Sequence, residues 1–379
     1  MVKVMVKKKR KKFSIKKTLR IVIPFLILLV LIINIKRIVT FTRSKITGYE
    51  YETIEAFNEL DIYNDIKKHD YSKTLEVASK SDVFKKEYLN NYLDISYQED
   101  DKKFINNINV LLALGYNSND VNKMYEVLSL DSIELIMNNV YYNDLYNILG
   151  LNYFHEVKLE KYLSYASQNE LDYTDVVTYV NIGLDHDYYT DMVKIEKEDD
   201  PLVLVNKYNI LSSNYIPSDL EAITSKYNKG YNNKLRHEAR IAFEKMCDAA
   251  LNDNIKIYSG SAYRSYSYQQ NLYNRYVNQD GKKKADTYSA RAGSSEHQTG
   301  LATDILNAKI DYISASDKEY TWLINNSYKY GYILRYPKGK EKITGYMYEE
   351  WHFRYLGIEL AKDVYDSKLT YDEYVARNN

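Results

Sequence analysis

SEHQTGLATDIL, residues 295–306, combines a histidine, a glycine turn and a short apolar strand. We predict a tight turn after His297 and a strand over Leu301–Leu306. Neighbouring segments suggest further elements of secondary structure. They are a turn ending in a helix cap at 216–219, helices at 234–251, 265–278 and 318–330, and strands at 255–259, 332–336 and 351–355. Helices and strands do not alternate regularly, so we expect an α+β domain with a small antiparallel sheet.

Three residues of this region could bind one metal ion. His297 and Asp304 would meet across the turn, and His352 would join them from a separate strand. Three protein ligands with an open fourth position are typical of catalytic zinc sites. Glu349 could then deprotonate an attacking water, and Arg264 could stabilise negative charge on the substrate.

The order of these motifs resembles the D-alanyl-D-alanine carboxypeptidase branch of the zinc metallopeptidases, which includes related L,D-carboxypeptidases. The resemblance covers about residues 200–366 and rests on three motifs. The matching positions are Ser295, His297, Gly300, Ala302 and Asp304 in the first motif, Glu349, Trp351 and His352 in the second, and Tyr263, Arg264, Ser265 and Gln269 in the third. Two positions depart from the pattern: Ala262 replaces a glycine, and Glu350 stands where proline is common.

The resemblance implies a Zn²⁺ site made by His297, Asp304 and His352, with Glu349 as general base and Arg264 as electrostatic stabiliser. It also implies that the substrate is the D-alanine-terminated stem peptide of peptidoglycan. The candidate substrate contacts are Ser295, Gln269, Tyr263 and Trp351. Hydrogen bonding within turns is the alternative role for Ser295 and Gln269, and core packing is the alternative for Trp351.

The N-terminus has the composition of a membrane segment. Residues 1–47 contain fourteen Lys or Arg and no Asp or Glu, and the run IVIPFLILLVLIINI at 21–35 carries no charge. We predict a basic cytoplasmic leader at 1–20 and a transmembrane signal anchor at 21–39, which leaves the rest of the chain facing the cell wall. A cleaved signal peptide is the competing interpretation, but small residues of A-x-A type do not follow the run.

The remainder of the chain is acidic, with 38 basic against 52 acidic residues. This charge argues against nucleic-acid binding, and a single cysteine, Cys247, excludes a disulfide framework. Residues 48–195 show short amphipathic helices that we interpret as an all-α, repeat-like spacer, although no constant period is visible. Residues 200–379 form the predicted catalytic domain.

Two other functions fit the same residues. An endopeptidase or D-Ala-D-Ala dipeptidase would use the same metal site on another bond of the stem peptide. A non-catalytic wall-binding module would use the helical region instead. The motifs leave open the choice between D,D and L,D specificity, the oligomeric state and whether the anchor is cleaved.

Overall fold

The computed structural model describes residues 15–98, 101–231 and 233–378. Its contacts divide the chain into two compact units, residues 1–149 and residues 150–379. The helices over residues 150–195, at the end of the predicted spacer, therefore fold in the same unit as the predicted catalytic domain.

The first unit contains helices and, in its described residues, no strand. Its elements are α1 (Ile15–Thr47), α2 (Tyr51–Glu59), α3 (Tyr63–Ile66), α4 (Lys73–Ser79), η1 (Lys86–Tyr88), α5 (Leu89–Asp94), α6 (Asp101–Leu114), α7 (Ser118–Val127), α8 (Leu130–Met137) and α9 (Leu145–Leu149). Polar caps start several of these helices. Asn117 and Asp120 form a capping box at α7, for example, and the Ser72 hydroxyl accepts from Leu75 N at α4. The predicted all-α region is confirmed.

Helix α1 contains the predicted membrane segment. Residues Leu19–Thr47 are long and apolar enough to cross a membrane, and their apolar side chains are exposed. This N-terminal apolar helix is either a signal anchor or a signal peptide. The basic residues of the predicted leader up to position 14 lie outside the described residues.

A polar motif occurs once in each compact unit. In the first, Asn109 accepts from the Tyr92 hydroxyl and donates to the Val83 carbonyl. In the second, Asn181 accepts from the Tyr162 hydroxyl at 2.7 Å and donates to the Tyr153 carbonyl at 2.9 Å. The carbonyl-to-asparagine spacing is 26 residues in one copy and 28 in the other. The two spacings therefore differ by two residues.

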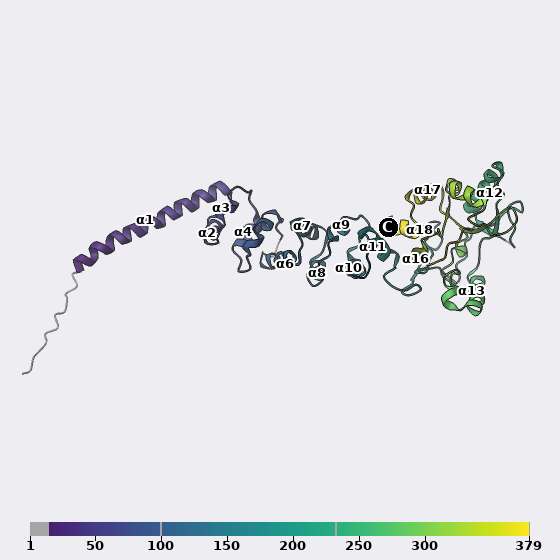
Figure 1. Cartoon of the computed structure of the whole chain (residues 1–379), viewed down its shortest axis with the longest axis horizontal. Helices are drawn as coiled ribbons and strands as arrows, with labels where there is room; N and C mark the ends of the chain where they lie inside the picture. The colour runs from purple at the N-terminus through teal and green to yellow at the C-terminus, as the bar shows by residue number, and fades with distance from the viewer. Residues whose placement is uncertain (1–14, 99–100, 232, 379) are drawn as a thin grey trace, which may run out of the picture. The chain divides into compact units, whose positions relative to one another are not determined.

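The second unit combines helices with short strands. Its helices are η2 (Glu156–Lys158), α10 (Leu159–Gln168), α11 (Tyr173–Ile182), α12 (His237–Asn252), α13 (Tyr266–Asp280), α14 (Lys282–Ala285), η3 (Glu296–Thr299), α15 (Lys318–Asn326), η4 (Ser327–Tyr330), α16 (Glu341–Thr344), α17 (Ile358–Ser367) and α18 (Tyr371–Asn378). Its strands are β1 (Val193–Lys194), β2 (Asn209–Ile210), β3 (Leu220–Ala222), β4 (Lys234–Arg236), β5 (Tyr258–Ser261), β6 (Ala302–Leu306), β7 (Tyr332–Leu334) and β8 (His352–Tyr355). Helix α18, drawn in yellow in Figure 1, lies against α11, where Asn181 donates to the Ala376 carbonyl at 3.2 Å.

A four-stranded sheet lies at the centre of this unit. Its strand order is β5-β6-β8-β7, and all three neighbouring pairs are antiparallel. The register places Asp304 of β6 opposite His352 of β8 and Ser261 of β5. The predicted α+β domain with a small antiparallel sheet is confirmed.

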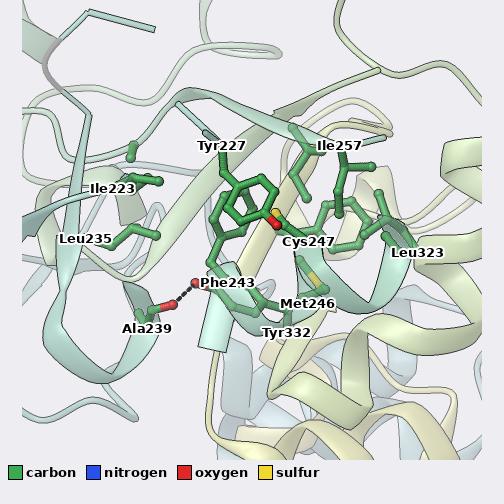
Figure 2. Packing of buried hydrophobic residues seen from close by; sticks show 14 of the residues in the cluster. Ile223, Tyr227, Leu235, Ala239, Phe243, Met246, Cys247, Ile257, Leu323 and Tyr332 are labelled. Atoms are coloured by element: carbon green, nitrogen blue, oxygen red, sulfur yellow. Dashed lines mark hydrogen bonds between the residues drawn. The ribbon is translucent and has the colours of Figure 1, made fainter. Parts of the chain in front are cut away.

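Helix α12 forms much of the apolar core against this sheet. Figure 2 shows Phe243, Met246 and Cys247 of α12 close to Tyr332 of β7, all of them buried. The Tyr332 hydroxyl donates to the Ala239 carbonyl at 2.7 Å, so even the polar tip of this side chain has a partner.

Two local predictions are wrong. Residues 234–236 form strand β4 instead of the first turn of a helix, and α12 begins at His237. The turn at 216–219 leads into strand β3 instead of a helix. The reason is the same in both cases: β3 and β4 pair with each other, with Leu220 opposite Arg236, and this pairing outweighs the local helix signals.

Candidate active site

A sharp turn and a strand pair bring the three predicted ligands together. His297 lies on η3, which ends at Gly300 with a left-handed φ of +67°. A side chain at this position would be strained, and its Cβ would lie 2.7 Å from Leu220 Cδ2. The chain then enters β6, so that Asp304 faces both His297 and, across the sheet, His352.

Two spacings between ligand atoms fit a tetrahedral metal ion, and all three ligand atoms lie within 4.8 Å of one another. Asp304 Oδ1 lies 3.4 Å from His297 Nε2 and 3.5 Å from His352 Nδ1. Zinc bonds of about 2.0–2.1 Å in tetrahedral geometry separate neighbouring ligand atoms by about 3.3 Å. All three side chains are buried, and Asp304 Oδ1 has no hydrogen-bond partner. A buried acceptor of this kind requires a partner, which a metal ion would supply.

Hydrogen bonds hold two of these side chains in place. His297 Nδ1 donates to the Ala262 carbonyl at 2.7 Å, which leaves the Nε2 lone pair directed at the site. Arg264 donates through Nη2 to Asp304 Oδ2 and through Nε to the Ser261 hydroxyl at 2.9 Å. Arg264 therefore orients the ligand carboxylate while its other donors remain at the cavity wall.

Charge and burial shift the pKa values of the site in opposite directions. Burial lowers the pKa of His297 to about 4, and the nearby Arg264 acts in the same direction. Burial also opposes the charge of His352, but the carboxylates of Glu296, Glu349 and Asp304 outweigh it and raise the His352 pKa to about 9. Without a metal ion, a protonated His352 thus supplies positive charge among three carboxylates.

Glu349 has the properties of a general base. Its Oε2 lies 3.3 Å from His352 Nδ1, next to the proposed metal position. Burial raises the pKa of this carboxyl, although His352 partly counteracts the effect. A carboxylate with a raised pKa can accept a proton from water and release it within one catalytic cycle.

These residues surround a cavity of about 290 Å³. Of the predicted substrate contacts, Ser295, Gln269 and Trp351 line this cavity. Gln269 donates to the Ala290 carbonyl at 2.8 Å, while its buried Oε1 has no partner. Tyr263 is not part of the lining; its backbone N–H donates to the Lys234 carbonyl. The unusual Glu350 does not line the cavity either.

Sequence reasoning missed several lining residues. Most are aromatic or apolar side chains from distant segments: Leu272, Tyr276, Tyr288, Tyr312, Tyr336, Tyr346 and Met347. In a chain with 42 tyrosines, none of these stands out. Glu296 was also missed; it adjoins His297, but its complete burial depends on arginines far along the chain.

Comparison with known proteins identifies the family to which this region is similar. Residues 232–358, which contain the whole cluster, match the family described as VanY, D-alanyl-D-alanine carboxypeptidase. The YodJ protein of Bacillus subtilis (strain 168) is 39% identical over 208 residues, covering 51% of this chain and 75% of the relative. The bifunctional D-Ala-D-Ala dipeptidase and carboxypeptidase VanXYC of Enterococcus gallinarum is 33% identical over 184 residues, covering 46% of this chain and 92% of the relative.

The chain belongs to the VanY D-alanyl-D-alanine carboxypeptidase family. This is a family of zinc peptidases, so the predicted enzyme class and cofactor are confirmed. A solved structure of a VanY D,D-pentapeptidase mutant in complex with Zn(II) is 34% identical to this chain. It aligns with a TM-score of 0.41 and covers 46% of this chain and 98% of that one.

Proposed function

We propose that the chain is a membrane-anchored zinc carboxypeptidase that removes the C-terminal D-alanine from peptidoglycan stem peptides. The arrangement of Asp304 Oδ1 between His297 Nε2 and His352 Nδ1, at tetrahedral spacing, carries this proposal. These three side chains would hold the metal ion. Zinc in such a site polarises a carbonyl group and lowers the pKa of a bound water toward about 7.

The protein's own side chains would perform the proton transfers. Glu349 is buried beside the metal position, so it is placed to take the proton of the attacking water. Its raised pKa allows it to keep that proton until the leaving D-alanine amine accepts it. The peptide bond breaks between the penultimate residue and this amine, and the water oxygen becomes part of the new carboxylate.

Substrate recognition would depend on the cavity walls. Two of the five Arg264 donors are used on Asp304 and Ser261, so others can bind the substrate carboxylate or the developing oxyanion. The unpaired Oε1 of Gln269 is an acceptor for a substrate N–H group. Ser295 and Trp351 would complete the contacts. Tyr263 does not line the cavity, and its proposed role is to hold its neighbour Arg264 in place.

The direct test is mass spectrometry of defined stem peptides. The full chain in detergent micelles would be loaded with zinc and incubated separately with pentapeptide and tetrapeptide stems, with and without EDTA. EDTA-sensitive loss of one alanine is expected, and the peptide that shortens distinguishes D,D from L,D activity. A zinc-loaded sample that shortens neither peptide would refute the proposal.

A dipeptidase activity is the second candidate, because the relative VanXYC is described as both a dipeptidase and a carboxypeptidase. Free D-Ala-D-Ala would be added to the same assay. Faster hydrolysis of the dipeptide than of either stem peptide would favour this alternative.

We also propose that α1 is retained as a signal anchor, with the N-terminus in the cytoplasm and the second unit outside. Ten basic residues precede the apolar run and four follow it within residues 36–47, and the excess before the run supports this orientation. Protease treatment of intact spheroplasts should digest the second unit and leave a protected N-terminal fragment. Release of the intact second unit into the medium would instead indicate a cleaved signal peptide.

A further inference from the structure

The buried carboxylate of Glu296 has an unusual position for a residue next to a metal ligand. Its side chain is 0% exposed, and Oε1 accepts from Arg335 Nε at 2.8 Å and from Arg354 Nη1 at 2.9 Å. Its second oxygen, Oε2, has no hydrogen-bond partner and lies 3.5 Å from His352 Nε2. That nitrogen is also buried without a partner. The two unpaired atoms therefore face each other.

The cluster around Glu296 is balanced in charge. Arg335 also donates to Asp372 Oδ2 at 2.6 Å, and Arg354 also donates to the Val203 carbonyl at 2.9 Å. Two guanidinium groups and two carboxylates thus share one buried site. Both guanidinium groups donate to Oε1 of Glu296, so Oε2 remains available as an acceptor.

A neutral imidazole can direct a lone pair from only one of its nitrogens, while the other carries hydrogen. For His352 the metal side is Nδ1, which lies 3.5 Å from Asp304 Oδ1. Binding through Nδ1 requires that Nε2 carry the hydrogen, and a buried N–H group requires an acceptor. Glu296 Oε2 is the acceptor at that position.

We propose that Glu296 is a positioning residue that accepts the Nε2–H of His352 and so fixes the tautomer whose Nδ1 faces the metal ion. The inference rests on the metal site of the proposed function. It also explains why the two histidines would bind the metal ion through different ring nitrogens. The Ala262 carbonyl fixes His297 for binding through Nε2, and the Glu296 carboxylate fixes His352 for binding through Nδ1.

The test compares Glu296→Gln with Asp372→Asn in the full chain. In Glu296→Gln the amide oxygen should remain on the two guanidinium groups, which turns the NH₂ group toward His352 Nε2. That nitrogen must then accept, so the hydrogen moves to Nδ1 and blocks the metal side. Asp372→Asn removes the other carboxylate that pairs with Arg335, while the hydrogen-bond partners of Asp372 are Arg335 and Asn206 and do not include His352 in the described residues.

Zinc affinity would be measured by competition with a chelator. We expect Glu296→Gln to weaken zinc binding about tenfold to a hundredfold. Asp372→Asn, compared under conditions in which it is folded, should change it by less than about twofold. Wild-type-like affinity in Glu296→Gln, or an equal loss in Asp372→Asn, would overturn the inference.

A spectroscopic readout on the wild-type protein covers the case in which Glu296→Gln does not fold. The six histidines would be labelled with ¹⁵N, and a long-range ¹H–¹⁵N spectrum of the zinc-loaded chain would be recorded. His352, assigned from the missing signal in His352→Gln, should carry hydrogen on Nε2. Hydrogen on Nδ1 would overturn the inference while leaving the hydrolase proposal intact. Failure of the wild-type chain to bind zinc would instead refute the metal site itself.

Discussion

Asp304 and His352 are directly opposite each other on the antiparallel strands β6 and β8, and their Oδ1 and Nδ1 atoms are 3.5 Å apart. Side chains at paired positions point to the same face of a sheet. Two of the three proposed ligands are thus positioned by strand register, and only His297 depends on a turn. A shift of one residue in this register would point one of the two side chains to the opposite face.

Substitution of a proposed ligand should remove the metal. His297→Gln deletes one of three proposed ligands, so bound zinc should fall well below one ion per chain, with loss of activity. Elemental analysis after dialysis measures the stoichiometry. His237→Gln is the matched control, because His237 is exposed and pairs with Glu221 away from the cavity. Full zinc occupancy in His297→Gln would contradict the ligand assignment.

Substitution of the proposed base should separate catalysis from metal binding. Glu349→Gln keeps the shape of the side chain but cannot accept a proton, so kcat should fall about 10²–10⁴-fold with zinc retained. Stem-peptide turnover and zinc content would be measured on the same sample. Glu350→Gln removes the adjacent carboxylate, which lies outside the cavity lining, and should leave turnover nearly unchanged. Comparable losses in both variants would argue against Glu349 as the base.

The stability of the metal-free protein should decrease as pH rises from about 6.5 to 9. His352 has a pKa of about 9 in the folded protein, above the value of about 6.5 expected when unfolded. The folded state therefore binds the proton more tightly, and this stabilisation is complete below about pH 6.5 and lost as pH rises through 9. The loss should be about 3 kcal/mol. The lowered pKa of His297 has its effect at acid pH: the stability of the folded protein should decrease as pH falls from 6.5 toward 4.

This pH dependence can be followed by tryptophan fluorescence during urea unfolding, since both tryptophans, Trp322 and Trp351, lie in the second compact unit. His352→Gln should remove the decrease between pH 6.5 and 9. Saturation with zinc should remove it too, because metal binding already displaces the proton. An unchanged slope in His352→Gln would mean that another group is responsible.

The buried hydroxyl of Tyr332 should contribute to the stability of the second unit. Tyr332→Phe removes its hydrogen bond to the Ala239 carbonyl, and the expected cost is about 1 kcal/mol. The same fluorescence-detected unfolding measures this difference at fixed pH. Tyr231→Phe is the control, because Tyr231 is 97% exposed and should have no measurable effect. A cost below about 0.3 kcal/mol in Tyr332→Phe would show that the hydroxyl is energetically neutral.

Local features of the sequence were sufficient to predict much of this fold. The glycine after Thr299 predicted a tight turn, and the structure has a left-handed Gly300 there. The apolar run at 301–306 predicted a strand, which the structure places at Ala302–Leu306. Both signals depend on residues close together in the chain. The predictions failed at β3 and β4, where each short segment is a strand only because the other is present.

The sequence by itself determined the α+β class and the apolar N-terminal helix, and it supplied the candidate ligand and base residues, because turn chemistry, hydrophobic runs and metal-binding side chains are local properties. Only the tertiary structure decided which nitrogen of His352 faces the site and why Glu296 is buried. The charge of Glu296 is compensated by Arg335 and Arg354, which are 39 and 58 residues further along the chain. Burial of a charge depends on such distant partners, and their approach is a property of the folded chain.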